Sequence, residues 1–315
     1  MHRLKVLLRH GLLALILAAG LPIAATAETP GVPSAPPVPY ALIDEAACRA
    51  RLEKEWPRAA AEQEYYRCKI DFARLEQAHP LTQEDLKTIT RENLTAASQE
   101  QLDQIYARLT AGPIPHGHYE IHLFRIRDFG QIVDIARQLA GEQLRGLAFL
   151  LSMPEEKRRD LLQLVWHTKD FDTNQRIVHT RIDNWQPLKA LILQPREKGV
   201  TTPGKPSPAD KERPPSFPAK VYCGQSLLDG RRESIIMDYA FNDDVRDYHP
   251  DFDWMMGRHG LRIRDEVRMI RPGFYLGRAY SGRIFLLNFV LISKEGEPTA
   301  KEDCWIGSQR VKTAK

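Results

Sequence analysis

Residues 262–293 read RIRDEVRMIRPGFYLGRAYSGRIFLLNFVLIS. Pro272-Gly273 and Ser281-Gly282 divide this stretch into three strand-like runs, at 262–270, 274–281 and 283–293. Runs rich in β-branched and aromatic residues, separated by short turns that contain glycine, are typical of antiparallel hairpins. The stretch therefore predicts three consecutive antiparallel strands.

Further strand-like runs precede this stretch. In residues 118–126, Tyr119, Ile121 and Leu123 share one face of a strand because they recur at every second position. Asp229-Gly230 predicts a type I′ hairpin turn. The other strand-like runs lie at 175–182, 188–194, 219–227 and 233–240. Many short strands with hairpin turns favour an antiparallel barrel or sandwich, whereas a doubly wound α/β fold needs a regular alternation of strands and helices.

Two helix-rich segments accompany the strands, so the predicted fold class is α+β. Residues 41–111 are dense in strong helix formers and predict three or four helices in a helical hairpin or bundle. Thr82, with Asp85 three residues later, is typical of a helix N-cap, and the last helix of this region is expected to start at 97–100. Later in the chain, one or two helices are expected to pack on the β domain, at 128–151 and 154–164.

The first 27 residues have the features of a secretory signal peptide. Arg3, Lys5 and Arg9 precede an apolar run at 11–23, and Ala25-Thr26-Ala27 forms an A-x-A cleavage site. The alternative is a membrane anchor, but the run is shorter than the ~20 residues that span a bilayer. We therefore expect a periplasmic or secreted protein that does not span the membrane after cleavage.

The rest of the chain divides by composition. A proline-rich linker at 28–40 leads into the helical region at 41–111. The predicted β domain covers 112–315 and is interrupted at 195–218 by a proline-rich loop.

Composition narrows the classes of function. The 315 residues are 43% hydrophobic and 27% charged, a balance typical of globular domains rather than of multispan membrane proteins. The net charge of +4 falls to +1 on cleavage of the signal peptide, since residues 1–27 contain three basic residues and no acidic ones. A net charge this small, dispersed along the chain, does not indicate the basic patch that is typical of nucleic-acid-binding proteins.

Several motifs in the second half resemble a family of uncharacterised bacterial exported proteins of lipocalin-like (calycin) type. They are VYCGQSLLDG at 221–230, IIMDY at 235–239, RDEVR at 264–268 and PGFYLGRAY at 272–280. Upstream, residues 113–117 and Trp166, Lys169 and Phe171 are similar to the family's opening segments, although Thr168 replaces an expected glycine and the proline-rich loop is an insertion. The resemblance covers about 113–293 and implies a small β-barrel without a settled activity.

A small barrel of this kind suggests a non-enzymatic binding protein as the first hypothesis. Such a barrel can enclose one apolar or lipid-like ligand. Interior side chains would come from alternate strand positions, and the candidate ligand-binding residues are Tyr222, Ile236, Tyr275 and Phe285. The alternative is that the same residues fill a dry core.

The sequence also leaves two other functions open. A hydrolase or isomerase acting on a lipid-like or small carbonyl substrate could use Asp238, Tyr239 and Glu266 as acid and base. Salt bridges to neighbouring arginines are the alternative role for these acids. Asp265 and Glu266 are adjacent, so only one of them can face a barrel interior. The third function is a cell-envelope interaction module that binds a partner through 41–110.

No nucleophile or cofactor motif is present. The chain lacks G-x-S-x-G, P-loop and G-x-G-x-x-G sequences. His116, His118 and His122 are all even-numbered, so they would lie on one face of a strand. However, His116 precedes the strand and no H-E-x-x-H spacing occurs, so no metal site is expected. We therefore expect no cofactor.

Four cysteines in an exported chain predict two disulfides. Of the three possible pairings we choose Cys48–Cys68 and Cys223–Cys304. A continuous helix would hold Cys48 and Cys68 ~30 Å apart, so the first pair requires a chain reversal, which Trp56-Pro57 supplies. The second pair would tie the strand at 219–227 to the C-terminal segment around Trp305. Free buried thiols are the alternative.

Overall fold

The computed structural model describes about half of the chain, all within one compact unit that extends from Pro33 to Lys315. The described residues are 34–42, 50, 70–128, 154, 167–182, 216–250, 252–295 and 304. Several predictions lie outside them: the signal peptide, the helices at 128–151 and 154–164, the strand at 188–194, most of the proline-rich loop, and the Cys48–Cys68 pair.

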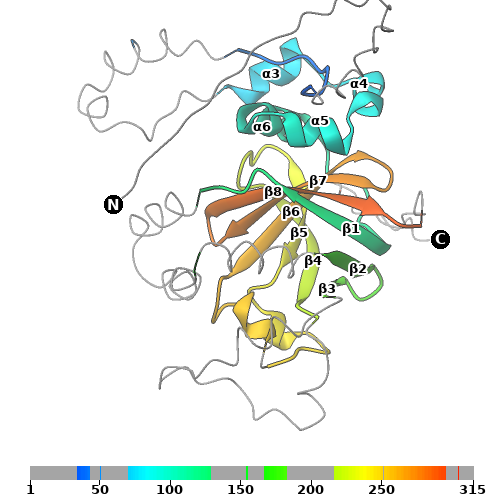
Figure 1. Ribbon diagram of the computed structural model, residues 1–315, viewed down its shortest axis with the longest axis vertical. Coiled ribbons are helices and arrows are strands. Elements are labelled where there is room, and N and C mark those ends of the chain that lie inside the picture. The colour runs from blue at the N-terminus through cyan, green and yellow to red at the C-terminus, as the bar shows by residue number, and fades with distance from the viewer. Residues whose placement is uncertain are drawn as a thin grey trace, which may run out of the picture. The chain divides into compact units, whose positions relative to one another are not determined.

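Eight antiparallel strands form a closed barrel in which each strand pairs with its neighbours in sequence (Figure 1). Pairing of the first strand with the last closes the barrel, for example at Ile121 and Leu291. Closure leaves no sheet edge open to another chain. The strands are β1 (Gly117–Phe124), β2 (Thr168–Asp172), β3 (Ile177–Arg181), β4 (Pro218–Gln225), β5 (Glu233–Asp238), β6 (Ile263–Arg271), β7 (Phe274–Ser281) and β8 (Ile284–Ser293). The predicted antiparallel barrel is confirmed.

Turn chemistry explains two of the hairpins and corrects a third. Gly273 and Gly282 have φ values of 74° and 58° and supply the positive φ that the β6–β7 and β7–β8 turns require. The type I′ turn predicted at Asp229-Gly230 is wrong, because neither residue has a positive φ. The connection from β4 to β5 is instead a longer loop between Gln225 and Glu233, in which the Ser226 hydroxyl and the Leu227 N–H donate to a carboxylate of β6.

Four short helices lie between residues 72 and 108: α3 (Phe72–Ala78), α4 (Gln83–Thr88), α5 (Arg91–Ala96) and α6 (Gln99–Arg108). The predicted N-cap at Thr82 is confirmed as a capping box with Asp85. Ser98 caps α6 in the same way, so the last helix begins where it was predicted. Whether residues 41–69 complete a bundle lies outside the described residues.

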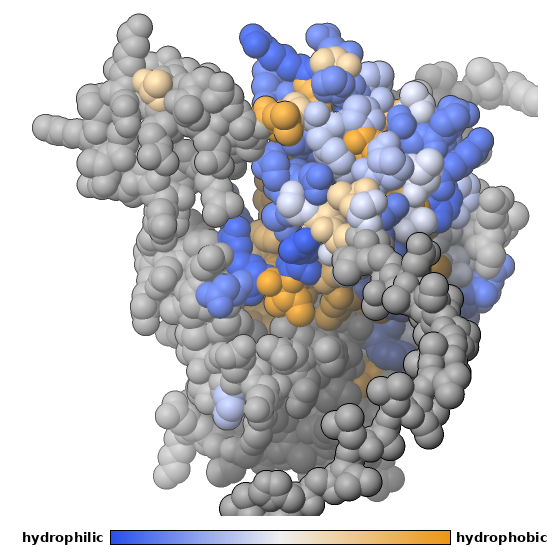
Figure 2. Space-filling model, turned by 45° about the horizontal axis from the view of Figure 1, so that its top comes forward, coloured by the Kyte–Doolittle hydropathy of each residue, from blue (hydrophilic) through white to orange (hydrophobic). Residues whose placement is uncertain are grey.

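The helices pack against the outer face of the barrel (Figure 1). Leu102, Ile105 and Tyr106 of α6 belong to the same buried cluster as Leu276 of β7 and Val290 of β8. Figure 2 shows the surface from the helical side, where hydrophilic residues cover much of the described surface and hydrophobic residues gather in small groups. The helical layer therefore uses its apolar side chains mainly against the barrel.

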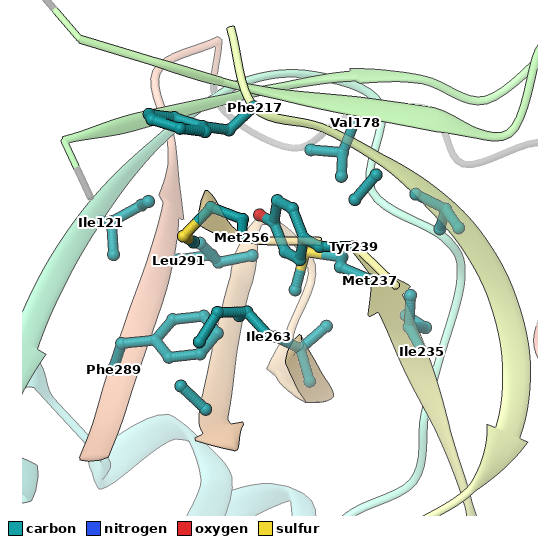
Figure 3. Packing of buried hydrophobic residues seen from close by; sticks show 14 of the residues in the cluster. Ile121, Val178, Phe217, Ile235, Met237, Tyr239, Met256, Ile263, Phe289 and Leu291 are labelled. Atoms are coloured by element: carbon teal, nitrogen blue, oxygen red, sulfur yellow. The ribbon is translucent and has the colours of Figure 1, made fainter. Parts of the chain in front are cut away.

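A second buried cluster fills the barrel interior (Figure 3). Side chains alternate between the two faces of a strand, so Ile235 and Met237 point inward from β5 while Ile236 points outward. On β7, Gly277 lies against the Phe289 ring, and a Cβ at position 277 would overlap that ring. The interior lining is therefore mostly apolar, and Phe289 fills the space beside Gly277.

Different segments cover the two ends of the barrel. At one end, the Tyr275 hydroxyl donates to the Pro113 carbonyl over 2.8 Å, and the Cys304 N–H donates to the Gly112 carbonyl over 3.1 Å. The disulfide Cys223–Cys304 holds the same end covalently and confirms the second predicted pair. At the opposite end, the segment 240–262 contributes Phe252, Met255 and Met256 to the interior cluster.

Candidate functional site

A polar cluster lies inside the otherwise apolar barrel. The Lys169 Nζ atom contacts the Tyr239 hydroxyl at 2.5 Å, Asp265 Oδ2 at 3.0 Å and Thr180 Oγ1 at 3.1 Å. The hydroxyls of Thr180 and Tyr239 lie 2.8 Å apart. All four side chains belong to residues with no exposed surface.

Strand pairing explains how four distant residues meet. Lys169 of β2 is paired with Thr180 of β3, so these two side chains are neighbours on the inner face. Asp265 of β6 is paired with Met237 of β5, whose side chain belongs to the interior cluster. Tyr239 follows the end of β5 and has the same inward parity as Met237. The cluster therefore lies toward the end that segment 240–262 covers.

Burial and mutual contact shift the pKa values of the cluster. Burial lowers the pKa of the Lys169 ammonium, but contacts with Tyr239 and Asp265 raise it, and the net shift is upward from 10.5. Burial raises the pKa of the Tyr239 phenol, and the nearby lysine only partly offsets this shift. At neutral pH Lys169 is therefore an ammonium and Tyr239 a neutral phenol.

The segment over this end of the barrel is itself organised by buried polar groups. Asp253 accepts hydrogen bonds from the Phe217 N–H at 3.0 Å and from the His249 N–H at 2.6 Å. The His249 ring packs edge-on against Phe252, with the ring centroids 4.9 Å apart. The described contacts of this segment are noncovalent, whereas a disulfide holds the other end.

The four predicted ligand-binding residues do not share one face. Tyr275 lies in the interior cluster, with its ring edge-on to Tyr119 at 6.0 Å. Tyr222 and Ile236 lie on the outer face, where they pair across β4 and β5. Phe285 also lies outside, stacked with Arg278 at 4.3 Å. The expectation that all four line the interior is wrong. Tyr222 and Ile236 have the parity of the outer face, and the register shift between β7 and β8 at Ala279/Tyr280 turns Phe285 outward.

The predicted acid and base residues are separated in the same way. Tyr239 is inside the barrel, whereas Asp238 points outward and accepts from the Tyr222 hydroxyl at 2.7 Å. Glu266 also points outward, and Arg264 forms an ion pair with it at 3.0 Å. The prediction that only one of the two adjacent acids faces the interior is confirmed, and that acid is Asp265.

Glu266 belongs to a second buried polar cluster, on the outer face of the barrel. It accepts from the Ser226 hydroxyl at 2.7 Å and from the Leu227 N–H at 3.0 Å. Beside it, the buried Arg268 guanidinium donates to six protein oxygens at 2.8–3.4 Å. Two of these acceptors are carbonyls of the last turn of α6, where a cation is favourable.

The sequence analysis did not identify Lys169, Thr180 and Asp265 as members of one cluster. The strand that carries Lys169 reads TKDFD, and this polar run carries too few apolar residues to show the alternation of a half-buried strand. Only the family resemblance drew attention to Lys169. Identification of the group required the strand pairing, because the members come from four separate parts of the chain.

Within the described residues, no group of three or more histidine, cysteine or acidic side chains is arranged to hold a metal. His116 instead contacts the Thr173 hydroxyl at 3.0 Å, and His118 pairs with Asp170. No helix in the described part of the chain is long and apolar enough to cross a membrane.

Comparison with known proteins gives no further guide, because no family model, curated protein or solved structure matches this chain. The closed antiparallel barrel is consistent with the lipocalin-like architecture that the motifs suggest.

Proposed function

We propose that this protein is an exported binding protein that holds a small, mainly apolar ligand inside the β-barrel. The observation that carries the proposal is the fully buried cluster of Lys169, Thr180, Tyr239 and Asp265 in an apolar interior. Buried ion pairs seldom improve stability, and apolar residues of similar volume often replace them without loss. Polar groups in such a setting are therefore candidates for a functional role.

The lining of the interior also suits a ligand. Met237, Met255 and Met256 belong to the interior cluster, and Figure 3 shows Met237 and Met256 near Tyr239. Methionine is unbranched and flexible, so it can repack around a guest molecule. We expect entry through the end covered by segment 240–262, because a disulfide restrains the opposite end.

Export is supported by the sequence of the first 27 residues, with a basic start, an apolar run and an A-x-A site. The disulfide Cys223–Cys304 agrees with a periplasmic or secreted location, because such bonds persist in oxidising compartments.

An experiment with two matched variants tests the proposal. Ala279 lies inside the barrel directly opposite Asp265, and Ala97 lies in the cluster between the helices and the barrel. Both are fully buried, so Ala279→Leu and Ala97→Leu should each cost about 1–3 kcal/mol by overpacking.

The readout is native mass spectrometry of protein isolated from its own host, together with uptake of the apolar dye N-phenyl-1-naphthylamine. We expect a bound small molecule and dye uptake in the wild type and in Ala97→Leu, and loss of both in Ala279→Leu. A wild-type protein that carries no ligand and takes up no dye would show that the interior is a dry core.

The contact of Tyr239 with Lys169 favours one second candidate function. A phenol beside an ammonium can act as a general acid toward a small carbonyl substrate. Consumption of such a substrate, lost in Tyr239→Phe, would favour an enzyme over a binding protein.

The interaction module receives less support from the surface. Of the described residues in 41–110, only Leu42 is an exposed large hydrophobic side chain. The stripe of apolar residues that would mark a partner surface is therefore not present on α3 to α6.

A further inference from the structure

We infer that the polar end of the ligand is a neutral hydrogen-bond acceptor, such as a ketone, aldehyde or ester oxygen, bound by the hydroxyl pair of Tyr239 and Thr180. This inference rests on the proposed binding function and specifies the chemistry that the cluster selects.

Counting protons in the interior cluster leads to this conclusion. Lys169, Tyr239 and Thr180 carry five polar hydrogens between them: three on the ammonium and one on each hydroxyl. The cluster contains four contacts, three from Lys169 and one between the two hydroxyls. Each contact uses one hydrogen, so one hydroxyl hydrogen is left over.

The count does not depend on which group holds which proton. If Tyr239 donates to Thr180, the threonine hydrogen remains, and if Thr180 donates, the tyrosine hydrogen remains. Transfer of a proton from Lys169 to Asp265 leaves the total unchanged. Within the described residues, the Thr180 and Tyr239 hydroxyls form no hydrogen bonds besides these, and the second oxygen of Asp265 accepts from neither of them. A buried donor without an acceptor costs about 1–3 kcal/mol, and an acceptor atom on a ligand would remove that cost.

The charge of the cluster selects between kinds of acceptor. The Lys169 ammonium lies 3.0 Å from the Asp265 carboxylate, so this pair adds no net charge to the cluster. A carboxylate ligand would add an uncompensated negative charge in an apolar enclosure, which is strongly unfavourable. A carbonyl oxygen satisfies the spare donor without this penalty.

The rest of the ligand should be apolar. Phe217, Met237, Met256 and Ile263 belong to the same buried hydrophobic cluster as Tyr239. Figure 3 shows these four side chains together in the interior. A hydrocarbon chain or ring attached to one carbonyl group matches this distribution.

A competition experiment tests the inference with three probes of equal chain length: decane, 2-decanone and decanoate at pH 8. Each displaces N-phenyl-1-naphthylamine from the wild type, from the double variant Tyr239→Phe/Thr180→Val, and from the control Tyr106→Phe. Tyr106 is a buried tyrosine on the outer face, with its hydroxyl 3.0 Å from Ser234, so it controls for loss of a buried phenol.

We expect the wild type and the control to bind 2-decanone at least ten-fold more tightly than decanoate. The double variant should lose about ten-fold in affinity for 2-decanone and less than two-fold for decane, since one hydrogen bond is worth about a factor of ten. Equal effects on the ketone and the alkane, or a preference for decanoate, would overturn the inference and leave the binding function standing.

A spectroscopic measurement keeps the inference testable if the double variant does not fold. The infrared carbonyl band of ¹³C-labelled 2-decanone bound to the wild type should lie at lower frequency than in hexane, because the oxygen accepts a hydrogen bond. A band at the hexane position would overturn the inference. Failure of the dye and of all three probes to bind would instead contradict the binding function itself.

Discussion

The barrel wall separates two buried polar clusters that differ in how completely they are satisfied. On the outer face, the Arg268 guanidinium uses all five of its N–H groups on protein oxygens, most of them backbone carbonyls. In the interior, Lys169, Thr180, Tyr239 and Asp265 form four contacts and leave one hydroxyl hydrogen without an acceptor among the described residues.

The difference teaches that burial of charge does not by itself mark a functional site. Arg268 joins the end of α6 to the β4–β5 loop, and its complete set of acceptors explains its burial as a structural role. The interior cluster joins strands that the barrel already holds together through backbone hydrogen bonds. We therefore expect apolar residues to be able to replace the interior cluster without loss of stability, but not Arg268.

The largest expected effect comes from breaking the interior ion pair on one side. Asp265→Leu leaves the Lys169 charge buried without its carboxylate and should lower the free energy of unfolding by about 3–5 kcal/mol. The double variant Lys169→Met/Asp265→Leu should recover most of this loss, because no charge remains. Urea unfolding of the three proteins measures both changes, and a double variant as unstable as the single one would show the pair to be structurally essential.

The outer cluster should behave differently. Arg268→Met removes the donors to carbonyls of Tyr106, Asp229 and Arg232 and should cost about 4 kcal/mol. No second substitution can restore stability, because the abandoned acceptors are backbone atoms. Hydrogen exchange should show the largest loss of protection at the end of α6, and a loss spread evenly over the barrel would contradict this role.

Removal of the disulfide should have an intermediate effect. The double variant Cys223→Ser/Cys304→Ser should lower the free energy of unfolding by about 2–4 kcal/mol, because the bond restrains the unfolded chain. The preference for 2-decanone over decanoate should persist, since the bond holds the end away from the interior cluster. Loss of the preference for 2-decanone would indicate that the ligand binds at the end held by the disulfide, away from the interior cluster.

The smallest effect concerns pH. The folded-state pKa of Lys169 lies above its ordinary value of 10.5, so its stabilising contribution is complete below that value and declines as the pH rises through the folded-state pKa. Between pH 7 and 9 this group should add no pH dependence to stability. The difference in thermal stability between the wild type and the double variant Lys169→Met/Asp265→Leu should therefore stay constant from pH 7 to 9 and change at strongly alkaline pH.

Much of the barrel could be predicted from the sequence. The alternation in 118–126 and the glycine turns at Gly273 and Gly282 place β1, β6, β7 and β8 within a few residues of their observed bounds. The capping residue Thr82 marks α4 in the same way. These features are local, so propensity and spacing carry the information.

The candidate site could not be predicted in the same way. Lys169 lies on a polar strand of five residues, and its contact with Asp265 joins residues 96 positions apart. Which face of β5 points inward was misjudged for Ile236, because both faces of β5 are buried and alternation in burial is absent there. Tyr222 of β4 pairs with Ile236 and lies on the same outer face. Both failures concern pairing and parity, which only the assembled barrel determines.

A crystal structure of the protein with 2-decanone tests the central claim most directly, because it locates the ligand oxygen relative to the cluster. The account predicts that this oxygen lies inside the barrel, within hydrogen-bond distance (~2.5–3.0 Å) of the Tyr239 or Thr180 hydroxyl. A ketone bound on the outer face, or bound inside with its oxygen directed away from both hydroxyls, would contradict it.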